Sequence, residues 1–179
     1  MKSLGPAADV AIPHEAGHVV VGRAVGLHAT GVEVEVERFF NPDGISIGNF
    51  ATLAYEPTDE AIPGMDPELR AAYVLFIAGG VAGARFSGIT TIDSGADPDR
   101  KELARLTTKS LEEVSDLAIG IIKPRRRAFR QLVSLMRQRY MDLVKNRDIQ
   151  TGHYTLLTED DLDKLFSQYA SVQTEQERT

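Results

Sequence analysis

The chain has 179 residues, of which 42% are hydrophobic, so it is long enough to bury one substantial core, and a second full domain is not expected. Its formal net charge of -6 argues against a general nucleic-acid binder, because such proteins neutralise phosphates with basic side chains. It contains no cysteine, so any metal site has to use histidine and carboxylate ligands.

Targeting signals are not evident in the sequence. The residues before His14 lack a continuous apolar core of signal-peptide length, and the most apolar stretch, residues 71–84, is too short to span a bilayer. We therefore expect a cytoplasmic protein with no membrane segment in this chain. Residues 1–170 are expected to form one domain, and residues 171–179 a flexible polar tail. We interpret the basic run at 123–127 as a solvated helix start or loop in preference to a nucleic-acid or partner patch.

The first half of the chain predicts a helix followed by a hairpin. A helix is expected from about Pro13 to Val25, because proline suits the first turn of a helix and Gly26 is a suitable terminator. Valine and glutamate then alternate over 32–37, as in a strand with one buried face, and residues 45–55 follow as a second strand. The turn signal Asn-Pro-Asp-Gly at 41–44 joins them.

Helices dominate the rest of the predicted fold. After a loop at 56–68, a buried helix is expected over 67–86, followed by a loop at 87–99. A helical pattern resumes from Asp99 until Pro124, and residues 126–147 predict a long amphipathic helix. A short last helix is expected after Thr158, which with Asp161 resembles a capping box. The predicted class is mainly α with a small β-hairpin or sheet.

The motif HEAGH at 14–18 indicates metal chemistry. Residues four apart on a helix are separated by about 400° of rotation, so His14 and His18 project from nearly the same side and can reach one ion. Glu15 lies beside that position, where it can take a proton from a zinc-bound water. Gly17 is unfavourable in a helix interior, which predicts that another backbone passes close to it.

The third metal ligand is not determined by the motif. An extended metzincin motif needs glycine and histidine where this chain has Val21 and Ala24, so that class is excluded. The remaining candidates are Asp93, Asp97 and Asp99, in a loop that runs into a helix. An aspartate at a helix start can be held by cap bonds while its carboxylate points outward, but each is equally interpretable as a plain helix cap.

Three segments resemble the peptidase domain of the FtsH family of ATP-dependent zinc metalloproteases. They are HEAGHVVVGRAVG at 14–26, IAGGVAGARFSGITTIDSGADPD at 77–99, and NRDIQTGHYTLLTEDDL at 146–162, which is similar to the family's closing helix and its final acidic turn. The resemblance covers His14 to about Phe166. It implies a zincin-type active-site helix, Zn²⁺ held by His14, His18 and Asp99, and Glu15 as the catalytic residue.

The chain also departs from this family. It contains no Walker-type GxxxxGK[ST] motif, and it has Ala82 to Arg85 where the family usually has an Ala-Glu-Glu phrase. The chain is therefore expected to be either an excised domain of a divergent relative or a free-standing FtsH-like peptidase, and its plausible start at Met1 favours the second. The resemblance further implies a separate ATPase partner and assembly as a homo-oligomer.

The expected function is a zinc-dependent metalloendopeptidase acting on a polypeptide substrate, which could pair with the strand near 45–54. One alternative is a metal-stabilised pseudo-peptidase or adaptor that binds unfolded chains or a partner ATPase. Another is a zinc hydrolase acting on substrates other than peptides, because water activation by zinc is chemically general.

Overall fold

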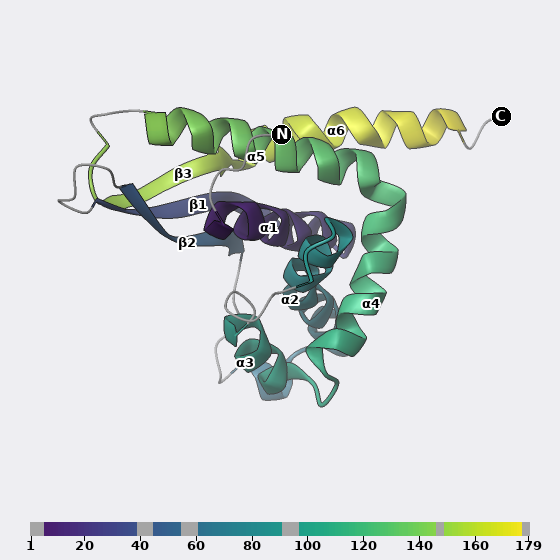
Figure 1. The fold of residues 1–179 in the computed structure, drawn as a ribbon. Coiled ribbons are helices and arrows are strands. Elements are labelled where there is room, and N and C mark those ends of the chain that lie inside the picture. The colour runs from purple at the N-terminus through teal and green to yellow at the C-terminus, as the bar shows by residue number, and fades with distance from the viewer. Residues whose placement is uncertain (1–5, 39–44, 55–60, 91–96, 146–148, 177–179) are drawn as a thin grey trace.

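The computed structural model describes residues 6–38, 45–54, 61–90, 97–145 and 149–176. Over these residues the chain is mainly helical with one small antiparallel sheet, which confirms the predicted class (Figure 1). The helices and strands are α1 (Pro6–Ala24), β1 (Ala29–Arg38), β2 (Ile45–Ala54), α2 (Pro67–Phe86), α3 (Asp97–Leu106), α4 (Leu111–Ile122), α5 (Arg126–Lys145), β3 (Gly152–Thr158) and α6 (Glu159–Gln176).

The sheet has the order β2-β1-β3, with β1 antiparallel to both neighbours. The predicted hairpin of β1 and β2 is confirmed, and its turn at 41–44 lies outside the described residues. Val32, Val34 and Val36 are fully buried, whereas Glu33 and Glu35 are only half-buried. The alternation of valine and glutamate therefore places one face of β1 on the core.

Strand β3 corrects the expectation of a closing helix within 146–162. Residues 152–158 pair with β1, and α6 begins only at Glu159. The strand was missed because its alternation is broken: Leu156 and Leu157 are both buried, next to a register shift at Val32 of β1. A shift of this kind lets two consecutive side chains face the core and hides the period of two.

Helix α1 begins earlier than predicted. It starts at Pro6, so Pro13 lies inside the helix rather than in its first turn. Proline has no N–H, so the bond from residue 13 to the carbonyl of Asp9 is missing at this point. The end of the helix agrees with the prediction: α1 stops at Ala24, and Gly26 follows with a φ of 82°, a conformation that glycine adopts readily.

The helical pattern expected from Asp99 to Pro124 is divided into α3 and α4 (Figure 1). Ser110 starts α4 with a capping box: its backbone N–H donates to Glu113 Oε2 at 2.8 Å, and its hydroxyl accepts from the Glu113 N–H at 3.2 Å. The first of these bonds lowers the pKa of the Glu113 carboxyl. Residues 107–109 contain neither proline nor glycine, so no local signal in the sequence marks this division.

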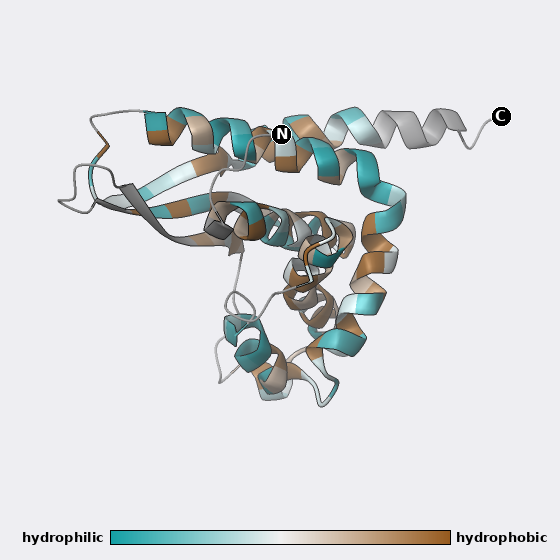
Figure 2. Cartoon of the chain, in the orientation of Figure 1, coloured by the Kyte–Doolittle hydropathy of each residue, from teal (hydrophilic) through white to brown (hydrophobic). Residues whose placement is uncertain are grey.

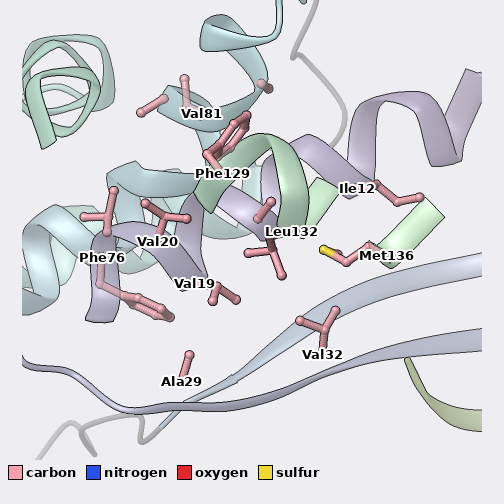
Figure 3. Packing of buried hydrophobic residues seen from close by; sticks show 14 of the residues in the cluster. Ile12, Val19, Val20, Ala29, Val32, Phe76, Val81, Phe129, Leu132 and Met136 are labelled. Atoms are coloured by element: carbon pink, nitrogen blue, oxygen red, sulfur yellow. The ribbon is translucent and has the colours of Figure 1, made fainter. Parts of the chain in front are cut away.

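The helices α5 and α6 complete the core. Phe129, Leu132 and Met136 are buried on one side of α5, which confirms the amphipathic helix predicted at 126–147. Figure 3 shows them with residues of α1 and Val32 of β1. The predicted cap of the last helix is present, since the backbone N–H of Thr158 donates to Asp161 Oδ2 at 3.1 Å. Helix α6 continues to Gln176, so it is longer than expected, and the segment expected as a tail starts within it.

Helix α2 is the buried helix predicted at 67–86, with Asp66 as its N-cap. By length and composition it could cross a membrane, which is weak evidence because 61% of its apolar window is buried inside the protein. Figure 2 shows hydrophobic residues along α2, whereas α3 is largely hydrophilic.

The basic run at 123–127 forms a short 3₁₀ turn, Lys123–Arg125, and the start of α5. Most of its side chains are exposed, in agreement with the interpretation of this run as a solvated helix start.

Candidate metal centre

Two histidines of α1 point their ring nitrogens at the same place. His14 and His18 are 6% and 7% exposed, although imidazole is a polar group that is seldom so deeply buried without a partner. Their Nε2 atoms lie 3.1 Å apart. The four-residue spacing therefore brings both ring nitrogens to one side of α1, as predicted. This side of the helix is buried inside the protein.

Asp99 of α3 completes the group. Its Oδ2 atom lies 3.3 Å from His14 Nε2 and 3.6 Å from His18 Nε2. Asp97, two residues earlier, is exposed and pairs with Arg100 at 3.3 Å instead. Asp93, the third candidate, lies outside the described residues. Of the two aspartates that the structure describes, Asp99 is the one that meets the histidines, as the resemblance implied.

The three donor atoms have the spacing of a metal site. In a tetrahedral zinc site with ligands at about 2.0–2.1 Å, neighbouring ligand atoms lie about 3.3–3.4 Å apart. The separations of 3.1, 3.3 and 3.6 Å lie on either side of that value. Asp99 Oδ2 is also buried without a hydrogen bond, which is costly for a carboxylate oxygen unless a cation neutralises it. The residues therefore fit a bound metal ion.

A backbone carbonyl fixes the tautomer of His18. Its Nδ1 lies 2.8 Å from the carbonyl oxygen of Phe76, on α2, and a carbonyl can only accept a hydrogen bond. The proton is therefore on Nδ1, and Nε2 carries the free electron pair that a metal needs. Metal-binding histidines are commonly oriented by such a bond from the second ring nitrogen.

The charge around His14 favours a cation at its ring. Burial acts to lower the pKa of His14 and is the largest single influence, but the attraction of Asp99 and the negative charge of Glu15 outweigh it. The pKa of His14 is therefore raised. A proton and a metal ion compete for the same nitrogen, so metal affinity at this site falls as the pH is lowered through the raised pKa.

Glycines of α2 let the two helices approach closely enough to form the site. A Cβ atom added at Gly80 would overlap His18 Nε2 and lie 2.5 Å from His14 Nε2, so the imidazoles occupy the space above this glycine. A Cβ atom at Gly17 would lie 2.9 Å from the Cα of Gly83 and would overlap the carbonyl oxygen of Gly79. The close backbone approach predicted at Gly17 is thus confirmed.

Glu15 lies beside the donor group on the same helix and is only 7% exposed. Its Oε2 atom accepts a hydrogen bond of 2.7 Å from the hydroxyl of Thr52, on β2. A carboxylate so close to a metal site and held by a neighbouring strand is placed to act on a proton. The sequence did not identify Thr52, Gly80 or the Phe76 carbonyl as parts of the site. The pair Gly79-Gly80 within an apolar helix was a signal for Gly80, and the sequence gives no comparable signal for the other two.

No family model matches this chain, and no curated protein matches it. The assignment of a function therefore depends on the chemistry of the site.

We expect Gly80→Ala to weaken metal binding. The new methyl group would occupy the space of the two Nε2 atoms, so the affinity for zinc should fall at least about tenfold, as when groups that orient metal ligands are removed. Isothermal titration of the metal-free protein measures this affinity. Gly120→Ala is the matched control, because Gly120 is an exposed helical glycine with open space around its Cβ position. Equal zinc affinity in the Gly80→Ala variant and the wild type would contradict the described packing.

Proposed function

We propose that this protein is a zinc-dependent metalloendopeptidase of the FtsH type. The observation that carries the proposal is the convergence of His14, His18 and Asp99 on one point, next to the buried carboxylate of Glu15. Three protein ligands leave one tetrahedral position for water or substrate, as in catalytic zinc sites, whereas structural zinc sites have four.

The donor set favours a transition metal, and the resemblance to the FtsH family selects zinc among these metals. Two imidazole nitrogens and one carboxylate oxygen suit zinc, whereas magnesium and calcium prefer ligand sets made entirely of oxygen. When bound, zinc supplies a Lewis acid that polarises the scissile carbonyl and makes water more acidic.

The chain's own residues would move the proton. Glu15 would accept a proton from the attacking water and return it to the nitrogen of the leaving amine, so that one side chain serves as base and then as acid. The burial of Glu15 supports this role, because a site shielded from bulk water strengthens electrostatic interactions with the reacting atoms. The bond from Thr52 holds one oxygen of the carboxylate.

An extended polypeptide is the substrate that the surroundings of the site favour. Strand β2 is at the edge of the sheet, so it can pair with a further strand, and its Thr52 contacts Glu15 directly. A polypeptide added to β2 would bind mainly through its backbone, with little dependence on its side chains. The resemblance to the FtsH family supports the same substrate class.

The experiment is cleavage of unfolded casein by the purified chain. We expect cleavage by the zinc-loaded protein, loss of cleavage after treatment with a chelator, and recovery when zinc is added back, because the reaction depends on the bound ion. Binding of one zinc ion per chain without cleavage would overturn the peptidase proposal and favour the adaptor function. Metal-dependent hydrolysis of small esters but not of polypeptides would instead indicate another kind of zinc hydrolase.

A further inference from the structure

The hydroxyl group of Thr52 contacts the proposed general base twice. It lies 2.7 Å from Glu15 Oε2 and 3.2 Å from the backbone carbonyl oxygen of the same residue. A hydroxyl has one proton, and the shorter distance has the usual length of an O–H···O hydrogen bond. The proton is therefore donated to the carboxylate.

The register of the sheet places Thr52 at this position. Thr52 pairs with Val32 of β1, whose side chain is fully buried on the face of the sheet that packs on α1 (Figure 3). Cross-strand partners project from the same face, so Thr52 points toward α1 as well. Its neighbours Ala51 and Leu53 are exposed on the other face. A polar side chain on the inward face of β2 requires a partner, and Glu15 provides it.

The consequence for Glu15 is a fixed orientation. A glutamate side chain has three rotatable bonds, and a proton-transfer group has to be held near the reacting atoms for efficient catalysis. Thr52 anchors one of the two carboxylate oxygens, Oε2. Because Thr52 belongs to the edge strand β2, the same strand that would bind an extended substrate also holds the base.

We propose that Thr52 is a positioning residue, which orients the Glu15 carboxylate through its hydroxyl group and so sets the geometry of proton transfer. This inference rests on the proposed peptidase function, in which Glu15 is the base. It assigns a role to the hydroxyl group itself and not to the shape of the side chain.

The test compares Thr52→Val with Thr52→Ser in the zinc-loaded chain, with unfolded casein as the substrate. Valine has the shape of threonine without its hydroxyl, and should lower kcat about 10- to 100-fold, the range seen when groups that orient catalytic ligands are lost. KM and zinc content should remain unchanged. Serine keeps the hydroxyl, so Thr52→Ser should restore kcat to within about threefold of the wild type.

Thr30→Val is the matched control. Thr30 is on the neighbouring strand β1, and its hydroxyl donates to the backbone carbonyl of Leu53 at 3.2 Å, away from Glu15. This variant should keep the kcat of the wild type. If Thr52→Val also keeps it, or if Thr52→Ser is as impaired as Thr52→Val, the hydroxyl group does not position the base and the inference is wrong.

A second measurement does not depend on activity. In urea unfolding of the metal-free chain, Thr52→Val should change the unfolding equilibrium constant at least about fivefold more in the wild-type background than in the Glu15→Ala background, because the second lacks the carboxylate acceptor. Equal changes in the two backgrounds would contradict the contact between Thr52 and Glu15.

The casein assay separates the two proposals. If the wild type fails to cleave casein, the peptidase function is wrong. If the wild type cleaves and Thr52→Val cleaves equally well, only the inference on Thr52 is wrong.

Discussion

Replacing Glu15 with glutamine is expected to leave zinc bound and to lower kcat for unfolded casein at least about 1000-fold, within the range of general acid–base catalysis. Glutamine has nearly the shape of glutamate, and its side-chain oxygen can still accept the hydrogen bond from Thr52. It cannot take a proton from water. Initial rates and the zinc content of the same preparation measure the two parts of this prediction.

Glu68→Gln is the control for this substitution. Glu68 is exposed in the first turn of α2, so the same chemical change occurs far from the proposed metal ligands. Its activity should equal that of the wild type. A Glu15→Gln variant that retains more than about a tenth of the wild-type kcat would show that Glu15 is not the base, because loss of such a group costs more.

Asp99→Ala is expected to lower the affinity for zinc more than about 100-fold, because it removes one of the three proposed protein ligands. Helix α3 should persist, since alanine is a better helix former than aspartate. Above the raised pKa of His14, where the imidazole is neutral, removing the buried Oδ2 should not destabilise the metal-free protein. Zinc titration and thermal unfolding of the metal-free variant measure both effects.

Asp97→Ala is the control for Asp99→Ala. Asp97 lies two residues away on the same helix and contributes an exposed pair with Arg100, which is worth little to stability. Its loss should leave zinc binding unchanged. If Asp97→Ala loses zinc and Asp99→Ala keeps it, the ligand has been assigned to the wrong aspartate. If both keep it, the assignment of an aspartate ligand is wrong.

The histidine pair could be predicted from the sequence because its geometry is local. His14 and His18 are one helical turn apart, so the helix alone brings their side chains together. The close approach at Gly17 could also be predicted, because an unfavourable glycine in an apolar helix requires a packing reason.

The rest of the site depends on contacts between distant segments. Asp97 and Asp99 are both near the start of a helix, and only the packing of α3 against α2 decides which carboxylate faces the histidines. Thr52 contacts Glu15 because the register of β2 on β1 turns its side chain toward α1. A shift of this register by one residue would turn the Thr52 side chain to solvent. Neither arrangement leaves a local pattern in the sequence.

A zinc titration of the metal-free wild-type chain, followed by X-ray absorption at the zinc edge, tests the central claim most directly. We predict saturation at one zinc ion per chain, with two imidazole ligands and oxygen ligands at about 2.0–2.1 Å. The absence of saturable binding, or a bound zinc ion with fewer than two imidazole ligands, would contradict a metal centre formed by His14, His18 and Asp99.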